Sequence, residues 1–309
     1  MSVLLIFIDG VGIGARDEHN PFFLLDANER SPLGVFANDP PVELPHGGRL
    51  AVTDACLGVE GRPQSASGQT TILTGVNIPA LLGYHKPGFP NARMREVLRE
   101  YSLFLRLARA GIDSLCFANA YSPLFFQKPP RWSSATTIAV ESAGMTLRTF
   151  DDMRRGAALY HDWSNRTLIA RGEDLLALQP DKAAAVLARL AAAHRFTLYE
   201  FFLTDVIGHK QDMPAAREIL AGLNRFLVEV LSRMDLHTTT VIVTSDHGNV
   251  EDLSVRTHTR NSVPTLVWGA RRDDVRARVH SLADITPTIF DVLASEDAGS
   301  GFSSTAYWC

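Results

Sequence analysis

One aspartate and two histidines in a short stretch of chain are the first residues whose types could do chemistry. Asp246 and His247 follow the apolar run at residues 241–243 after two intervening residues, and His258 follows after a short polar loop. Ligands usually bind at the carboxyl ends of the strands in an open α/β sheet. Carboxylate and imidazole groups together are typical ligands of divalent transition-metal ions. The alternative is a plain turn, in which Asp246 accepts bonds from backbone amides and both histidines face solvent.

Two further apolar runs end in acidic residues. Asp9 follows the run at residues 3–8, and Asp205 follows the run that begins at Phe196, with His209 four positions later. That spacing places both side chains on one face if the segment is helical. Because parallel strands end at the same edge of a sheet, we expect the acidic groups and the histidines to lie together.

A candidate nucleophile lies in residues 63–75, which read as a tight turn that enters a helix. A hydroxyl group there would lie beside unpaired backbone amides and the positive end of the helix. A metal ion at the same point would lower the pKa of the hydroxyl and make it nucleophilic. Ser65 and Ser67 both fit, and the alternative for each is a simple helix N-cap, where serine is favoured.

Apolar runs that alternate with helical periodicity predict the elements that position these residues. The predicted buried strands are Val3–Ile8, Ile112–Asn119, Phe196–Leu203, Thr240–Thr244 and Pro264–Trp268. The predicted helices between and after them include Asp181–His194, Asp212–Met234 and Asp284–Leu293, with Asp212 and Asp284 as N-caps. This alternation predicts an α/β fold with a doubly wound, mostly parallel sheet flanked by helices.

Two segments interrupt this alternation of strands and helices and indicate the domain organisation. Residues 121–180 are rich in proline and aromatic residues and have weak periodicity, so we predict a small inserted cap there. Residues 33–48 carry several prolines and glycines and are predicted to be a loop. The whole chain, residues 1–309, is predicted to form one metalloenzyme domain that includes this cap.

Composition excludes several classes of function. A formal net charge of −4 argues against nucleic acid or an anionic membrane as partner, since both need a basic face. The cysteines, Cys56, Cys116 and Cys309, are odd in number and far apart, which fits a reducing compartment. The apolar run before Asp9 is too short for a signal peptide or a membrane span. We therefore predict a cytoplasmic protein; its oligomeric state is left open.

Taken together, the motifs resemble the alkaline phosphatase superfamily of two-metal enzymes. Within it, they are most similar to the branch that contains cofactor-independent phosphoglycerate mutase and phosphopentomutase. The matching segments occur in the family's order, at residues 8–10, 65–75, 205–209, 244–249, 257–264 and 282–288. The resemblance implies an alkaline-phosphatase-like fold and a metal-dependent phosphatase, phosphodiesterase or phosphomutase that acts on a small phosphorylated metabolite.

The resemblance also implies a ligand set for two divalent metal ions. One site would be formed by Asp205, His209 and His258, and the other by Asp9, Asp246, His247 and the Ser65 oxygen. The family nucleophile lies ten positions before the glycine that closes its helix, which here is Gly75, so Ser65 is preferred over Ser67 and Thr70. Mixed carboxylate and imidazole ligation favours Mn²⁺ or Zn²⁺ over Mg²⁺.

Departures from the family bear on the reaction and the substrate. The sulfatase branch carries Cys/Ser-x-Pro-x-Arg, whereas this chain has Ser65, Ser67 and Gln69 at those places, which excludes a sulfatase. Phosphoglycerate mutases carry a large arginine-rich cap, and the smaller insertion here favours a hydrolase over a mutase. The candidates for contact with an anionic substrate are Lys86, Asn249, Arg131 and Arg260, and the alternative for each charged one is an ordinary solvated surface charge.

Two other functions are alternatives to phosphoryl transfer. Residues 10–15 fit the dinucleotide-binding pattern GxGxxA, but that fingerprint needs a helix directly after the glycines, and residues 16–21 read as a loop. A non-catalytic metal- or ligand-binding protein that retains the fold is the second rival. The complete set of candidate ligands argues against it, since those side chains have no structural use together.

Overall fold

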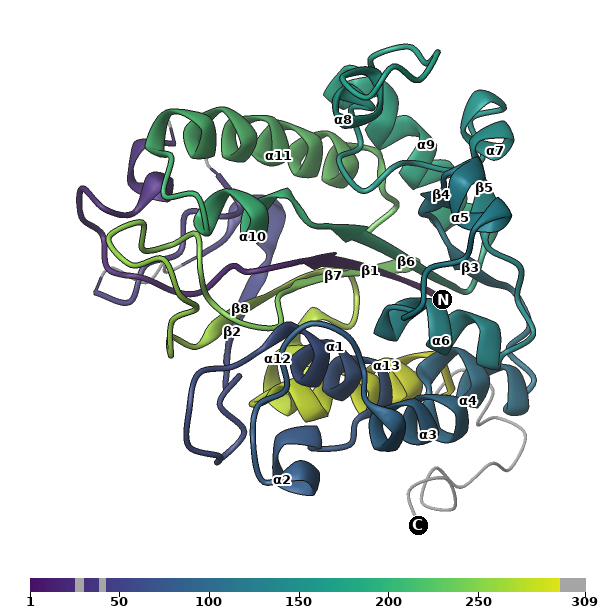
Figure 1. Ribbon diagram of the computed structural model, residues 1–309, viewed down its shortest axis with the longest axis horizontal. Coiled ribbons are helices and arrows are strands. Elements are labelled where there is room, and N and C mark those ends of the chain that lie inside the picture. Colours follow the sequence, from purple (N-terminus) through teal and green to yellow (C-terminus); the bar gives the residue numbers. More distant parts are fainter. Residues whose placement is uncertain (26–30, 39–42, 295–309) are drawn as a thin grey trace.

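A six-stranded sheet forms the centre of the molecule (Figure 1). The computed structural model describes residues 1–25, 31–38 and 43–294. In spatial order the strands are β2 (Arg49–Thr53), β8 (Val263–Trp268), β7 (Thr239–Thr244), β1 (Ser2–Ile8), β6 (Phe196–Phe201) and β3 (Leu115–Phe117). β1 pairs in parallel with both β6 and β7, and β3 pairs in parallel with β6. β8 is antiparallel to both of its neighbours, β7 and β2.

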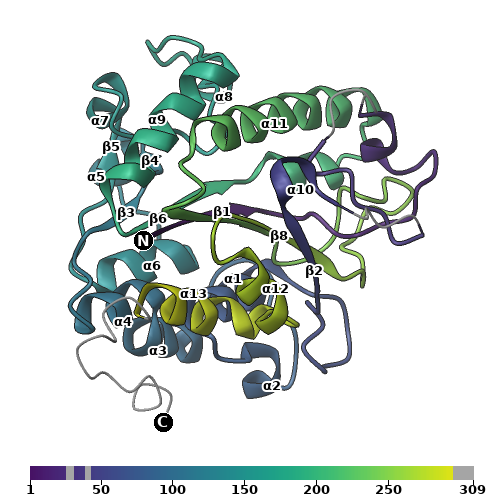
Figure 2. The same ribbon diagram turned by 180° about the vertical axis from the view of Figure 1, so that it is seen from behind.

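Helices cover both faces of this sheet, as Figures 1 and 2 show from opposite sides. One face carries α9 (Pro180–Ala193), α10 (Leu203–Gly208) and α11 (Met213–Arg233). The other carries α1 (Ser65–Thr74), α2 (Ile78–Leu82), α3 (Ala92–Tyr101), α4 (Leu103–Arg109), α6 (Ala135–Ser142), α12 (Arg272–Arg278) and α13 (Ile285–Ala294). Successive residues of β1 point into the two resulting cores in turn, so the strand reads as one unbroken apolar run.

The predicted fold class is confirmed, and all five predicted strands are present. β2 was not predicted, because its sequence RLAVT is short and polar at both ends, as suits a strand at the edge of a sheet. β3 is shorter than predicted and covers only Leu115–Phe117.

The predicted helix starts are right in one case and wrong in another. Asp212 is the N-cap of α11, and its side chain accepts a bond from the Ala215 amide at 3.1 Å. Asp284 does not cap a helix. It is the third residue of a short 3₁₀ turn, and its carboxylate accepts a bond from the amide of the real cap, Ser281, at 2.8 Å. The capping box therefore starts three residues before the predicted cap.

Residues 121–180 hold several short elements beside the β3 edge of the sheet (Figure 1). They are α5 (Pro123–Gln127), β5 (Arg148–Thr149), α7 (Phe150–Arg154) and α8 (Arg166–Ile169), together with α6; β5 pairs with β4 (Ala120–Tyr121). A cap function for them, and a single domain over the whole chain, stay predictions. The loop predicted at residues 33–48 holds only the 3₁₀ turn Pro45–Gly47 in its described part, and residues 39–42 lie outside the described residues. Among the described helices, none combines the length and the apolar character that a membrane span requires.

Candidate metal centre

Three strands deliver acidic residues to one edge of the sheet. Asp9 follows β1 directly, Asp246 follows β7 after one residue, and Asp205 lies in α10 just after β6. The side chains gather into two groups whose ligand atoms lie within 4.8 Å of one another: Asp205 with His209 and His258, and Asp9 with Asp246 and His247. The structure thus brings together the ligands that the sequence predicts, from segments far apart in the chain.

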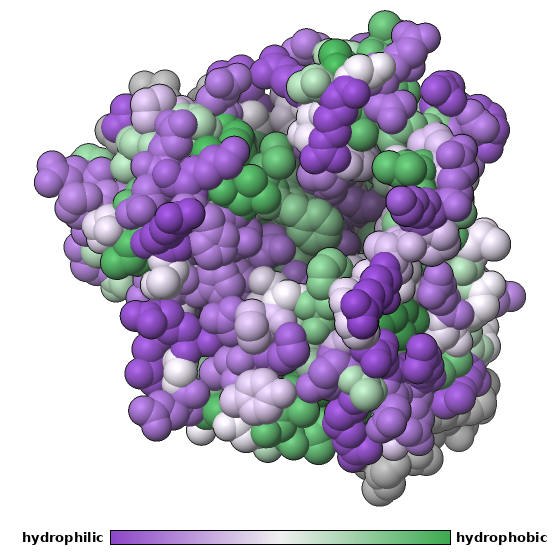
Figure 3. All heavy atoms as spheres, in the orientation of Figure 1, coloured by the Kyte–Doolittle hydropathy of each residue, from purple (hydrophilic) through white to green (hydrophobic). Residues whose placement is uncertain are grey.

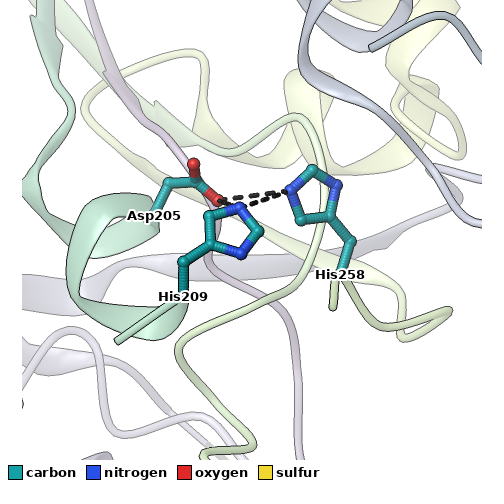
Figure 4. A group of neighbouring side chains, drawn as sticks. All are labelled: Asp205, His209 and His258. Carbon is teal, nitrogen blue, oxygen red and sulfur yellow. Dashed lines mark hydrogen bonds and ion pairs between the residues drawn. The ribbon is translucent and has the colours of Figure 1, made fainter. Parts of the chain in front are cut away.

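The first group has the spacing of a metal site (Figure 4). The His258 Nε2 atom lies 3.4 Å from Asp205 Oδ1 and 3.2 Å from His209 Nε2, and His209 Nε2 lies 3.5 Å from Asp205 Oδ1. Ligand atoms at tetrahedral positions around Zn²⁺ lie roughly 3.3 Å apart, given bonds of about 2.0 Å. The three atoms therefore fit one small divalent ion.

Hydrogen bonds fix which nitrogen each of these histidines presents. His209 Nδ1 donates to the Arg256 carbonyl at 2.8 Å, and His258 Nδ1 donates to the Pro63 carbonyl at 2.9 Å. With the proton on Nδ1, each Nε2 keeps its lone pair toward Asp205. A second hydrogen bond of this kind is what metal-binding histidines ordinarily have, because it fixes ring orientation and tautomer.

The ligands of the second group are buried and lie beside the candidate nucleophile. His247 Nε2 lies 3.3 Å from Asp9 Oδ1, 3.5 Å from Asp246 Oδ2 and 2.9 Å from the hydroxyl oxygen of Ser65. Asp9 Oδ1 is buried without a hydrogen-bond partner in the described part of the chain. A buried carboxylate oxygen without a donor suits a cation, since leaving it bare is costly. This group fits a metal ion as well, although among the described residues His247 Nδ1 has no partner of the kind that His209 and His258 have.

The two groups adjoin each other. The rings of His247 and His258 stack with their centroids 3.7 Å apart. α1 approaches so closely that a Cβ atom on Gly68 would lie 2.9 Å from the Asp246 carbonyl oxygen. Only glycine lets the first turn of this helix, and Ser65 with it, lie against the end of β7.

Burial shifts the pKa values of the buried carboxyl groups and of the His247 imidazole in opposite directions. Burial and the charge of Asp205 raise the pKa of Asp246 to about 7, and burial with the neighbouring carboxylates raises the pKa of Asp9 well above its ordinary value. Burial lowers the pKa of His247 to about 3. Burial alone would raise the pKa of Asp205, but the interactions with His258, the other neighbouring histidines and Asn249 prevail and lower it to about 2. Carboxylates held together against repulsion in this way gain most from a bound cation.

Comparison with known proteins finds a family model that matches part of the chain. Residues 177–297 match the family model described as the metalloenzyme superfamily, a segment that includes Asp205, His209, Asp246, His247 and His258. Over this segment, the chain is similar to the metalloenzyme superfamily. This confirms the resemblance that the motifs predict.

Two curated relatives are similar to this chain in sequence, and one solved structure is similar in fold. A phosphopentomutase of Alkaliphilus metalliredigens is 34% identical over 101 residues, which cover 31% of this chain and 25% of the relative. A 2,3-bisphosphoglycerate-independent phosphoglycerate mutase of Antithamnion sp. is 32% identical over 145 residues, 42% of this chain and 28% of the relative. The PH0037 protein of Pyrococcus horikoshii has a similar fold, with a TM-score of 0.55 at 14% identity, covering 98% of this chain and 99% of that one. The match thus spans only about a quarter of each curated relative.

Sequence reasoning missed a buried glutamate that connects two loops of the candidate site. Glu251 accepts bonds from the amides of Gly12 and Asn249 at 2.9 and 2.7 Å, and from the side chains of Thr259 and Asn261. It thereby ties the loop after β7 to the loop after β1. Nothing in its spacing reveals this role, because all of its partners are distant in sequence or are backbone groups.

Two more residues of the site were not predicted. The Gln69 side-chain amide lies between Asp246 and Asp9, donating at 3.2 and 3.4 Å. Its position one helical turn after Ser65 would have predicted that it shares a face of α1 with the nucleophile. Glu200 is buried in β6 and accepts a bond from the Thr136 hydroxyl. A lone charge in the apolar run FTLYEF was the available signal.

The predicted substrate contacts are spread more widely. Asn249 lies in the centre, but its side-chain amide donates to Asp205 Oδ1 at 2.7 Å, so it positions a metal ligand. The Lys86 carbonyl accepts a bond from the Ser67 amide, and the Lys86 amide donates to the Ser67 hydroxyl. The Lys86 ammonium group donates to the Pro87 carbonyl. Arg260 is exposed, and Arg131 lines a separate cleft between α3 and α6. Substrate contact by these four residues stays a prediction.

The glycines after β1 pack beside the candidate metal centre, and no helix of a dinucleotide-binding motif follows them. Residues 11–15 continue as a loop rather than entering a helix, as the sequence predicts. A Cβ atom on Gly12 would lie 2.3 Å from Glu251 Oε1. The glycine is therefore explained by the close approach of this carboxylate.

His258→Ala is expected to remove one metal equivalent per chain and leave the other. His258 belongs to the group with Asp205 and His209, and the buried group around Asp246 keeps all of its own ligands. Elemental analysis of the purified variant measures this. The exposed His237 gives the control, since His237→Ala should keep both metals. Loss of both metals from the His258 variant alone would mean that the two groups do not bind independently.

Glu200 is expected to make the metal-free protein less stable as pH rises. Burial raises the pKa of its carboxyl to about 8 from an ordinary 4.5, so the folded protein retains a proton that the unfolded chain loses. Stability from this group is thus complete below pH 4.5 and is lost as pH rises toward 8. Between about pH 6.5 and 8, the free energy of unfolding should fall by about 2 kcal/mol on its account.

Urea unfolding of chelator-treated protein at the two pH values measures this fall. Glu200→Gln keeps an acceptor for the Thr136 hydroxyl but has no proton to lose. The fall should therefore be smaller in that variant by about the same amount. An unchanged pH dependence in Glu200→Gln would show that the carboxyl titrates in its ordinary range.

Proposed function

We propose that this protein is a two-metal-dependent phosphoryl-transfer enzyme in which Ser65 attacks a small phosphorylated metabolite. The observation that carries the proposal is the position of the Ser65 hydroxyl, 2.9 Å from His247 Nε2 and beside two groups of candidate metal ligands. Ser65 is partly accessible, whereas Asp246 and His247 beneath it are fully buried. A substrate can thus reach the hydroxyl from the side that faces away from the core.

The residues around Ser65 suit an anionic substrate. Asp205, His209 and His258 would hold one cation, and Asp9, Asp246 and His247 would hold the other, with Mn²⁺ or Zn²⁺ as the proposed ions. Such cations supply charge neutralisation for the phosphoryl group and activation of the hydroxyl. Ser65 opens α1, and in the described part of the chain the amides of Ser65 and Ala66 have no protein acceptor. These amides can donate to phosphoryl oxygens at the positive end of the helix.

The proposed reaction forms a bond between Ser65 Oγ and phosphorus while the ester oxygen leaves with a proton. In a hydrolase, water then attacks phosphorus, the bond between phosphorus and Ser65 Oγ breaks, and the serine oxygen takes up a proton as inorganic phosphate leaves. In a mutase, another hydroxyl of the same molecule attacks instead, which requires that the intermediate be held away from water. Figure 3 shows an open hollow near the middle of one face, lined by hydrophilic and hydrophobic residues. We propose the hydrolase, because the inserted segment at residues 121–180 is small.

A phosphoester panel tests the proposal. Phosphomonoesters, phosphodiesters and phosphosugars are incubated with protein loaded with Mn²⁺ or Zn²⁺, and free phosphate and isomeric esters are measured separately. Release of phosphate supports the hydrolase, and recovery of an isomeric ester supports the mutase. Absence of turnover across the panel by the fully loaded protein would favour a non-catalytic metal-binding protein.

The partner proposed is a small molecule and neither nucleic acid nor membrane. A formal net charge of −4 disfavours both of these polyanionic surfaces. The cytoplasmic location stays a prediction.

A further inference from the structure

A second polar cleft lies between α3 and α6, apart from the proposed metal ligands. It has a volume of about 640 Å³, within the usual range for small-molecule sites. Its lining residues are Arg95, Arg99, Arg131, Trp132, Ser133, Ile138, Glu141 and Ser142. The metal ligands and Ser65 are not among them, and no role for this cleft follows from the proposed phosphoryl transfer.

The cleft is strongly basic in a chain that is acidic overall. Three guanidinium groups face it against the single carboxylate of Glu141, whereas the whole chain has a formal net charge of −4. Within the described residues, no carboxylate lies within ion-pair distance of Arg95, Arg99 or Arg131. Arg93 on the same helix is instead paired, with its Nη1 3.3 Å from Glu96. The cationic groups of the cleft are thus available to an outside anion.

An exposed tryptophan holds two of these arginines in place. The guanidinium carbons of Arg95 and Arg131 lie 5.5 and 5.1 Å from the centroid of the Trp132 ring. Arg95 Nη1 also donates to the Pro90 carbonyl at 2.8 Å. Cation–π contact of this kind orders a guanidinium without neutralising its charge. Ordered, uncompensated guanidinium groups lose little conformational entropy when an anion arrives.

We propose that the cleft between α3 and α6 binds the phosphate groups of a small phosphorylated molecule. Guanidinium groups bind phosphate through paired, charge-assisted hydrogen bonds, and three of them can engage two phosphates or one phosphate from several sides. Trp132 is 45% exposed and offers an apolar surface to the rest of the ligand. α6, which lines the cleft, is also bonded to the central sheet, because Thr136 in its first turn donates to Glu200 of β6.

Two sources can supply this ligand chemistry. One is a second phosphate of the substrate itself, held at a distance from the reacting one. The other is a separate phosphorylated effector. The binding of phosphate does not depend on the proposed function, and only the choice between these sources does.

Calorimetric titration of chelator-treated full-length protein with sodium pyrophosphate tests the site. Without metal ions, Asp9, Asp205 and Asp246 at the proposed catalytic centre repel an anion, so that centre should compete only weakly. We expect saturable binding in about 0.15 M salt, where weak surface attraction is screened. Arg99→Gln and Arg131→Gln should each weaken binding about tenfold. Arg93→Gln on the outer side of α3 should leave it unchanged, since Arg93 already pairs with Glu96.

Absence of saturable pyrophosphate binding would overturn the proposal, as would equal weakening by all three substitutions. If binding is present, steady-state kinetics of the metal-loaded variants separates the sources. A raised KM with unchanged kcat in Arg99→Gln and Arg131→Gln identifies a second phosphate of the substrate. Unchanged KM together with lost pyrophosphate binding identifies an effector. Failure of the phosphoester panel would refute the proposed function without affecting the titration.

Discussion

Ser65→Ala is expected to reduce turnover of phosphoesters by at least roughly three orders of magnitude while both metal ions stay bound. The hydroxyl is the only group of Ser65 that reaches His247, and the buried ligands Asp9, Asp246 and His247 keep their mutual contacts without it. The rate of product formation and the metal content per chain are measured on the same preparation. Turnover near that of the unmodified protein would mean that Ser65 is not the nucleophile.

Ser67→Ala is the matched control for this substitution. Ser67 lies in the same turn of α1 but is fully buried, and its hydroxyl donates to the Gln64 carbonyl and accepts from the Lys86 amide. Its loss should cost stability, about 1 kcal/mol for each hydrogen bond removed, and leave most of the turnover. The opposite ranking of the two variants would assign the nucleophile to Ser67.

Removal of the metal ions is expected to abolish turnover and to lower stability together. Without cations, Asp9, Asp205 and Asp246 repel one another. Burial, and after it this repulsion, raises the pKa values of Asp9 and Asp246. A bound ion replaces that repulsion by attraction and adds free energy of unfolding, about 4 kcal/mol at a free metal concentration about 1,000 times Kd. Activity and the thermal midpoint are measured after chelation and after return of Mn²⁺ or Zn²⁺.

Mg²⁺ provides the comparison in the same experiment. It prefers six oxygen ligands, whereas three of the candidate ligands here are imidazoles, so it should restore less activity and less stability than Mn²⁺ or Zn²⁺. Full activity of the chelated protein would contradict a metal-dependent reaction. Full recovery with Mg²⁺ alone would contradict the proposed choice of ion.

The sequence alone determined the kind of site and its place on the fold. Asp9, Asp205 and Asp246 each follow a buried apolar run, and parallel strands must end at a common edge. The i, i+4 spacing of Asp205 and His209 likewise requires only one turn of helix, and the structure has it in α10. Such patterns are local, so periodicity and turn chemistry suffice to predict them.

Only the tertiary structure decided how these groups meet. The placement of β1 between β6 and β7 brings Asp9 to the other two acidic residues, and no local pattern specifies that order of strands. Glu251, Gln69 and the arginine cleft depend on contacts between segments whose separation in sequence carries no periodic signal. The physical reason is that long-range contacts are selected by the packing of whole helices and strands against the sheet, whereas sequence spacing constrains only neighbours within a turn or two.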